Sequence, residues 1–258
     1  MLKIQNSKSE PTQNLKPEIQ NENVRILLWD IDGTLLQSTR GGAFKEYFAP
    51  AMEKVYGSSG TLAEMSVSGM TDSQIAYEAL KDEGFSTKEI FTKIGDFTKI
   101  LAVKMSHFVS EQNEPYRLLA GAREILEAAS KNPCFVSALL TGNFAIGAEI
   151  KLKYFDLWKY FENQPNTFGE TSHDRRELAK TAGKNINKFL KTELNHDQFI
   201  VIGDTPNDIA CARALGAKMI SVATGRNHPA EELLSFKPDV VLENLADTKR
   251  VLEIFESL

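Results

Sequence analysis

Two aspartates stand one residue apart at the end of an apolar run, in the stretch RILLWDIDGTLLQS at Arg25–Ser38. In an extended backbone, residues i and i+2 project to the same side, so Asp30 and Asp32 would direct two carboxylates into one small volume. Two like charges held that close cost free energy unless a cation or a substrate compensates them. Asp and Gly are also ordinary turn residues, so the DxDGT fragment alone fits a solvated turn equally well.

The apolar run before Asp30 is one of five that predict β-strands. The other four are CFVSALL at 134–140, QFIVIG at 198–203, AKMISVA at 217–223 and PDVVL at 238–242. Between them, apolar residues recur at helical spacing, as at Ala122, Ile125 and Ala129. Strands that alternate with helices predict an α/β fold, with a Rossmann-like doubly wound parallel sheet as its core and helices on both faces.

Polar residues follow three of these strands. Asp30 ends the first strand, Thr141, Gly142 and Asn143 follow the second, and the segment DTPND at 204–208 follows the third. In open parallel sheets, ligands bind beyond the carboxyl ends of the strands. The sequence therefore predicts a ligand site at this edge.

The segment 41–113 interrupts the alternation of strands and helices. It contains amphipathic helical stretches at 43–56, 71–83 and 87–111 and no convincing strand. Its breaks, at Arg40–Gly42 and Asn113–Pro115, both lie next to the predicted site edge. We therefore expect an all-helical cap domain at 41–113, inserted into a core of residues 24–40 and 114–258 and hinged to close over it.

Composition narrows the function classes. The chain has 258 residues, a formal charge of -5 and no Lys/Arg block interleaved with aromatics, which argues against nucleic acid as the main partner. No apolar segment approaches the roughly 20 residues that span a bilayer, so we expect no membrane partner. Residues 1–23 are polar and predict a flexible tail rather than a signal peptide. Cys134 and Cys211 lie in apolar contexts, which favours the cytoplasm. The sequence is compatible with a monomer or a dimer.

The order of the chemical fragments resembles the haloacid dehalogenase (HAD) superfamily. The fragments are DIDGTL at 30–35, the run that ends in Thr141, a basic residue near Arg175 and GDTPND at 203–208. SGMTDSQI at 68–75, LLAGAREILEAA at 118–129, LLTGNFAIGAEIKL at 139–152 and VIGDTPNDIACARALGAKMISVATG at 201–225 are similar to its phosphoglycolate-phosphatase-like branch, which has a helical cap between the first and second motifs. The resemblance spans Arg25–Leu258.

The resemblance implies an Mg²⁺-dependent phosphatase. Asp30 would be the nucleophile that forms an aspartyl-phosphate, and Asp32 would be the general acid and base. Dehalogenases of the superfamily lack this second aspartate, so Asp32 favours phosphate ester chemistry. Asp30 and Asp204 would bind Mg²⁺ through side chains, Asp32 through its backbone carbonyl and Asp208 through water. Asp208 also fits a purely structural role in a capping box with Thr205, and the two roles can coexist.

The resemblance also implies a phosphate-binding set of Thr141, Gly142, Asn143 and a basic third-motif residue. A helix that begins near Asn143 would offer backbone N–H groups to phosphate, although TGN alone is more often a strand-to-helix turn. The third motif is usually a lysine, and here the choice lies among three residues: Arg175, Arg176 and Lys180. Arg175 shares a face with the apolar stripe of its helix and is predicted to point inward, whereas the other two fit solvated helix charges.

Substrate choice would rest with the cap, where the pattern is weaker. Arg40, Ser68, Gly69 and Thr71 could face the site, although Thr71 with Gln74 also fits a capping box. The expected substrate is a small phosphorylated metabolite, and phosphoglycolate is a choice at family level only. A β-phosphoglucomutase-like phosphomutase and a non-catalytic Mg²⁺- and phosphate-binding module remain alternatives.

Overall fold

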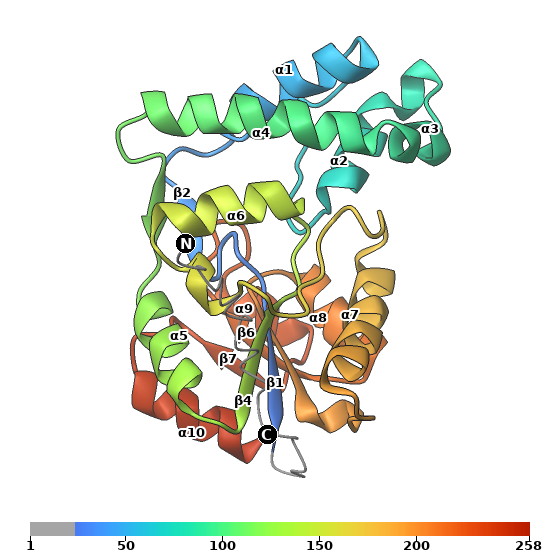
Figure 1. Cartoon of the computed structure of the whole chain (residues 1–258). Helices are drawn as coiled ribbons and strands as arrows, with labels where there is room; N and C mark the ends of the chain where they lie inside the picture. Colours follow the sequence, from blue (N-terminus) through green and yellow to red (C-terminus); the bar gives the residue numbers. More distant parts are fainter. Residues whose placement is uncertain (1–23) are drawn as a thin grey trace, which may run out of the picture.

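A five-stranded parallel sheet forms the centre of the computed structural model, which describes residues 24–258 (Figure 1). The strand order is β4-β1-β5-β6-β7. The strands are β1 (Arg25–Trp29), β4 (Phe135–Leu139), β5 (Phe199–Gly203), β6 (Lys218–Val222) and β7 (Val240–Leu242). These are the five runs predicted from the sequence, and the α/β fold class is confirmed. The predicted tail at 1–23 lies outside the described residues.

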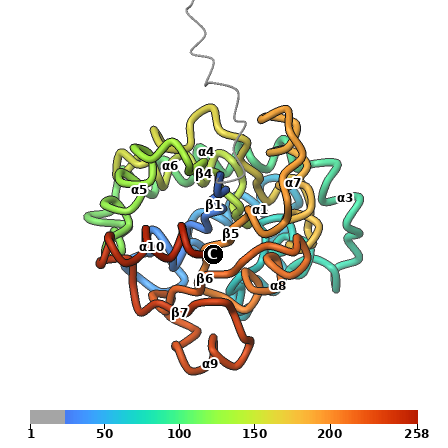
Figure 2. Tube along the Cα trace, turned by 90° about the horizontal axis from the view of Figure 1, so that it is seen from below, coloured from blue at the N-terminus to red at the C-terminus, as the bar shows by residue number. Residues whose placement is uncertain are grey.

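Helices cover both faces of the sheet, with α5 and α10 on one side and α7 and α8 on the other (Figure 2). The period of two in β1 explains why both faces need cover. Leu27 and Trp29 pack into the core shared with α5 and α10, whereas Ile26 and Leu28 pack into the core shared with α7 and α8. The helices of this part are α5 (Ala122–Lys131), α6 (Ala145–Tyr154), α7 (Arg175–Leu190), α8 (Pro206–Leu215), α9 (Ala230–Ser235) and α10 (Thr248–Ser257), with short 3₁₀ turns at Trp158–Tyr160 and His196–Gln198.

The register of the sheet brings the strand ends level. Trp29, the last residue of β1, pairs with Leu139 of β4 on one side and Ile202 of β5 on the other. The residues that follow these strands therefore reach the same edge, as the parallel topology requires.

Four helices lie together beyond this edge (Figure 1). They are α1 (Lys45–Tyr56), α2 (Asp72–Leu80) with a 3₁₀ turn at Lys81–Glu83, α3 (Thr87–Thr92) and α4 (Ile94–Glu111). Aromatic rings join them internally: Phe48 of α1 meets Phe97 of α4 edge to face, with centroids 5.1 Å apart. Phe97 also meets Phe144, which directly precedes α6, at 5.5 Å.

Two local features differ from the sequence prediction. The helix predicted at 87–111 is divided at Lys93, where Thr92 turns its hydroxyl back to the Lys88 carbonyl at 2.8 Å. An unpredicted antiparallel ribbon, β2 (Leu36–Ser38) with β3 (Tyr116–Leu118), joins the helical segment to the core. Strands of three residues are too short to show a period of two.

Neither cysteine is bonded to the other: Cys134 and Cys211 are both free thiols. Within residues 24–258, no helix combines the length and the apolar character needed to cross a bilayer.

Candidate active site

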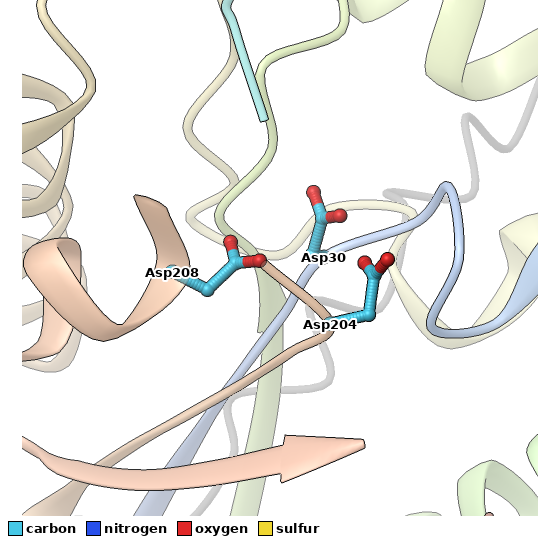
Figure 3. A group of neighbouring side chains, drawn as sticks. All are labelled: Asp30, Asp204 and Asp208. Atoms are coloured by element: carbon cyan, nitrogen blue, oxygen red, sulfur yellow. The ribbon is translucent and has the colours of Figure 1, made fainter. Parts of the chain in front are cut away.

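Three buried carboxylates converge at the carboxyl edge of the sheet. Asp30 directly follows β1, Asp204 directly follows β5, and Asp208 lies in the first turn of α8. One carboxylate oxygen from each lies within 4.8 Å of the others. Figure 3 shows the three side chains around one common space. The sheet thus brings together residues that are far apart in the chain.

Glycine makes room for this cluster. Gly33 has a φ of +91°, and a Cβ atom there would lie 2.2 Å from Oδ2 of Asp204. Any other residue would be strained by that φ and would also clash with the carboxylate. Thr34, the next residue, donates its hydroxyl to Oδ1 of Asp204 at 3.3 Å. The GT pair of DIDGT therefore fits the loop after β1 around Asp204, which follows β5.

Asp208 both caps helix α8 and faces the acidic cluster, as the sequence allowed. Its backbone N–H donates to Thr205 Oγ1 at 3.3 Å, and its Oδ2 accepts from the Thr205 N–H at 3.0 Å, which completes a capping box with Pro206 at the first helical position. The other oxygen, Oδ1, faces the acidic cluster and accepts from Arg175. Helix capping thus fixes the direction in which this carboxylate points.

Arg175 lies over the carboxylates. Its Nη2 donates to Oδ1 of Asp30 at 3.0 Å and to Oδ1 of Asp208, and its Nη1 donates to the Gly69 carbonyl at 3.2 Å. The Arg175 side chain is only 8% exposed. Arg176 and Lys180, the alternatives from the sequence, instead form surface ion pairs with Asp174 and Glu177.

When all three carboxylates are ionised, the cluster carries more negative charge than Arg175 balances, because three carboxylates and one guanidinium then leave two net negative charges. Burial raises the pKa of Asp30 from 3.8 to about 7. The positive charge of Arg175 opposes this rise in the pKa, whereas the negative charges of Asp208 and Asp32 add to it. Burial likewise raises the pKa of Asp204 well above its ordinary value, and Asp208 and Asp30 add to this. Hard oxygen donors with this surplus of charge fit a divalent cation such as Mg²⁺.

Asp32 has different neighbours from Asp30. Its Oδ2 accepts from Nζ of Lys151 at 2.5 Å and from Nδ2 of Asn143 at 2.8 Å. Sequence analysis missed Lys151, which lies in α6 and is buried. The sequence holds only a weak signal for it: Asn143, Gly147 and Lys151 recur every four residues, but this spacing does not show that Lys151 meets Asp32.

Comparison with known proteins supports this architecture. Residues 176–248 match a family model described as HAD-hydrolase-like. No curated protein matches the chain in sequence. A predicted phosphoglycolate phosphatase from Haemophilus somnus 129pt has a similar structure, with a TM-score of 0.58, 20% identity and coverage of 90% of this chain and 99% of that chain. For a predicted phosphatase from Clostridium acetobutylicum, the TM-score is 0.61, with 16% identity and coverage of 89% and 99%.

A proposed β-phosphoglucomutase from Bacteroides vulgatus also shares the fold, with a TM-score of 0.61, 16% identity and coverage of 92% of this chain and 91% of that chain. Residues 176–248 are thus similar in sequence to HAD-like hydrolases, and the fold of the chain is similar to the folds of these neighbours. This confirms the resemblance drawn from the DIDGTL and GDTPND fragments. The structural likeness covers nearly the whole described chain, whereas the sequence match is confined to its C-terminal part.

The loop after β4 is arranged differently from the sequence expectation. Helix α6 begins at Ala145, two residues later than expected. The N–H groups expected to face phosphate are bonded to carboxylates: Phe144 donates to Asp72 Oδ2 at 2.8 Å, and Ala145 donates to Glu170 Oε1 at 2.7 Å. Burial raises the pKa of Asp72 to about 7, although Lys151 and the Phe144 N–H oppose the change. The helix terminus thus anchors α2 through Asp72.

Thr141 is fully buried, and its hydroxyl accepts from Nδ2 of Asn143 at 3.0 Å. Gly142 approaches the helical segment closely: its carbonyl accepts from the Asp72 N–H at 2.8 Å, and a Cβ there would lie 2.4 Å from the Met70 carbonyl oxygen. Thr141 and Asn143 thus support each other, while Gly142 makes the contact with the loop before α2.

A cavity of about 440 Å³ opens between the α/β core and helices α1, α2 and α4. Asp30, Asp204 and Arg175 line its floor, and Asp32 lines its wall beside Asn143 and Lys151. Its roof is largely apolar; the roof residues include Phe44, Phe48, Met65, Val67, Met70 and Leu101. The cavity therefore joins a charged floor to a largely apolar roof.

Of the helical-segment residues expected near the site, Arg40, Ser68 and Gly69 line the cavity, whereas Thr71 is buried as the N-cap of α2. Arg40 pairs with Glu46 at 2.8 Å at the mouth, where both side chains are about half exposed. The Ser68 hydroxyl lies 3.2 Å from Nε2 of His228, which belongs to the core. Contacts of this kind hold the helical segment against the core.

Proposed function

We propose that this protein is an Mg²⁺-dependent phosphatase that hydrolyses a small-molecule phosphate monoester through an aspartyl-phosphate on Asp30. The observation that carries the proposal is the convergence of Asp30, Asp204 and Asp208 beneath Arg175 at the floor of a cavity. Such a site can hold a metal ion, a nucleophile and a phosphoryl group within reach of one another.

In the first step, a carboxylate oxygen of Asp30 attacks phosphorus, and the bond from phosphorus to the ester oxygen breaks. Asp32 gives its proton to the departing oxygen, so that an alcohol leaves instead of an alkoxide. Arg175 donates to Asp30 at 3.0 Å, which fixes the nucleophile and keeps a positive charge beside the transferring group.

In the second step, Asp32, now a carboxylate, takes a proton from water as the water oxygen attacks phosphorus. The bond between phosphorus and Asp30 breaks, inorganic phosphate forms, and both aspartates return to their starting state. Gly142 and Asn143 also line the cavity, where the Gly142 N–H and the Asn143 side chain would contact phosphoryl oxygens.

Mg²⁺ would be held by the side chains of Asp30 and Asp204, by the backbone carbonyl of Asp32 and, through water, by Asp208. When bound, it would neutralise charge on the phosphoryl oxygens. The two surplus negative charges of the buried cluster support this choice.

The size of the cavity, about 440 Å³, supports a small phosphorylated metabolite as substrate. Phosphoglycolate enters as one compound to test, because one structural neighbour is described as a predicted phosphoglycolate phosphatase. The cytoplasm is the proposed location, and the two free thiols are consistent with its reducing conditions.

A phosphomutase is the second candidate, because a proposed β-phosphoglucomutase shares the fold. A mutase would exclude water from the aspartyl-phosphate and return the phosphoryl group to a sugar. The products therefore distinguish the two activities: inorganic phosphate for the phosphatase, an isomerised sugar phosphate for the mutase.

The test is phosphate release from a panel of phosphate esters, with Mg²⁺ and with a chelator. The panel includes phosphoglycolate, glucose 1-phosphate and p-nitrophenyl phosphate. We expect Mg²⁺-dependent release by the wild type and none by Asp30→Asn. The matched control is Asp156→Asn, because Asp156 is an exposed aspartate paired with Lys159. Absence of both release and isomerisation would instead support a non-catalytic module that binds Mg²⁺ and phosphate.

A further inference from the structure

Asp32 is held in place by a closed set of three hydrogen bonds. Lys151 Nζ donates to Asp32 Oδ2 at 2.5 Å and to Asn143 Oδ1 at 2.6 Å, and Asn143 Nδ2 donates to the same Asp32 oxygen at 2.8 Å. Asn143 lies in the loop before α6 and Lys151 lies in its last turn, so one helix and its leading loop supply both donors. The Asp32 carboxylate is therefore oriented by groups outside its own loop.

Among the lysines within residues 24–258, Lys151 stands out as buried, with a side chain only 8% exposed. Burial by itself would lower the pKa of its ammonium group, but the nearby Asp32, Tyr116 and Asp72 outweigh burial and raise the pKa. The ammonium group therefore stays charged. A buried charge costs several kcal/mol unless it is paired, so its position must be tied to these carboxylates.

The hydrogen bonds leave one oxygen of Asp32 available. Both donors use Oδ2, and within residues 24–258 no protein group bonds to Oδ1. The Asp32 side chain is 43% exposed and lines the cavity. An atom placed in this way can meet the ester oxygen of a substrate in the cavity.

We infer that Lys151 is a positioning residue for proton transfer: it fixes Oδ2 of Asp32 so that Oδ1 delivers the proton to the leaving-group oxygen. The inference rests on the proposed phosphatase function. It assigns the two buried cations of the site to different carboxylates, because Arg175 bonds to Asp30 and Asp208, whereas Lys151 bonds to Asp32.

Two other roles for Lys151 make different predictions. If Lys151 only supported the fold, its substitution would lower kcat/KM for every substrate equally. If Lys151 bound the phosphoryl group of the substrate, its substitution would also weaken inhibition by inorganic phosphate. A residue that positions the general acid matters only when the leaving group needs a proton.

The test uses two esters of similar size. Benzyl phosphate releases an alcohol that must be protonated as it leaves, whereas p-nitrophenyl phosphate releases a stabilised anion that leaves without a proton. The quantity measured is kcat/KM, which covers the steps up to phosphorylation of Asp30. We expect Lys151→Met to lower kcat/KM for benzyl phosphate by about 10- to 100-fold, and for p-nitrophenyl phosphate by less than about 3-fold.

The matched control is Lys153→Met, because Lys153 lies in the same helix turn but is 60% exposed and pairs with Glu149. It should leave both values unchanged. Lys151→Gln, which keeps a donor but loses the charge, provides a second variant if Lys151→Met does not fold. Equal losses on both esters, no loss on either, or weaker inhibition by inorganic phosphate would each overturn the inference.

A crystal structure of Lys151→Met tests the same inference without turnover. We expect Asp32 to leave its place beside Asn143 while Asp30 and Asp204 keep theirs, and an unmoved Asp32 would contradict the inference. If the wild type hydrolyses no ester, the proposed function fails, but this structure still decides whether Lys151 positions Asp32.

Discussion

Asp30 and Asp32 are two residues apart, yet they occupy two different regions of one cavity. Asp30 belongs to the floor: it is 5% exposed, faces Asp204 and Asp208, and accepts a hydrogen bond from Arg175. Asp32 belongs to the wall: its side chain is 43% exposed and bonds to Lys151 and Asn143. Two aspartates in one short stretch after β1 therefore lie in two different environments.

The difference between these two environments explains how one loop can supply both a nucleophile and a proton donor. The floor concentrates negative charge that a metal ion can compensate, and it keeps Asp30 dry and fixed. The wall exposes one oxygen of Asp32 to the cavity and fixes the other, so that a proton can come and go. Variants that affect one region alone should therefore leave different kinetic signatures.

The largest effect should come from the floor. Asp30→Asn keeps the shape of the side chain but removes the nucleophile, so we expect kcat to fall by at least about 1,000-fold for every ester. The measurement is release of p-nitrophenol, with a thermal melt to show that the variant is folded. Wild-type turnover by this variant would exclude Asp30 as the nucleophile.

Asp204→Asn should act through the metal ion. Removing one of three converging carboxylates should weaken Mg²⁺ binding by at least about tenfold, because hard cations depend on charged oxygen ligands. Titration calorimetry with Mg²⁺ measures this directly, with Asp197→Asn as a control on an exposed aspartate. Unchanged Mg²⁺ affinity would place the ion elsewhere.

The wall should give a selective effect. Asp32→Asn removes the proton donor but leaves the floor intact, so we expect kcat/KM to fall by about 100-fold for benzyl phosphate and much less for p-nitrophenyl phosphate. Equal losses of kcat/KM for the two esters would show that Asp32 acts together with the floor carboxylates and not as the proton donor.

The smallest effect concerns Asp72, the carboxylate of α2 that accepts from the Phe144 N–H and lies near Lys151. Its pKa of about 7 exceeds the ordinary 3.8, so the folded protein binds the proton more tightly than the unfolded chain. Stability should therefore fall as the pH rises from about 4 to about 7.

Asp72→Asn should flatten this fall, by on the order of 5 °C in Tm across that range. The melts are run with saturating Mg²⁺, so that the carboxylates of the floor contribute equally to both proteins. Identical pH profiles for the wild type and the variant would contradict the pKa assigned to Asp72.

The floor was predictable from the sequence because its determinants are local. An apolar strand ends in Asp30, another ends before Asp204, and parallel strands deliver their carboxyl ends to one edge. The capping pattern around Thr205 and Asp208 could be read in the same way. Choosing Arg175 over Arg176 needed only the periodicity of one helix.

The wall was not predictable because its contacts are tertiary. Lys151 stands in the sequence KLKY, which is typical of a basic last turn of a surface helix, and only the packing of α6 beneath α4 buries it. Asp72 fits the first turn of a helix, and nothing in its neighbourhood indicates that it caps a different helix. Sequence periodicity shows on which face of a helix a side chain lies but not which distant residues contact it.

The most direct test of the account is to locate the phosphoryl group in a stalled reaction. Asp32→Asn should slow hydrolysis of the aspartyl-phosphate, so the variant is mixed with p-nitrophenyl phosphate and Mg²⁺, quenched in acid and mapped by peptide mass spectrometry. We predict one phosphoryl group on the peptide that contains Asp30, and none when Asp30→Asn is added. Phosphorylation of a different residue, or turnover with no phosphorylated peptide, would contradict the account.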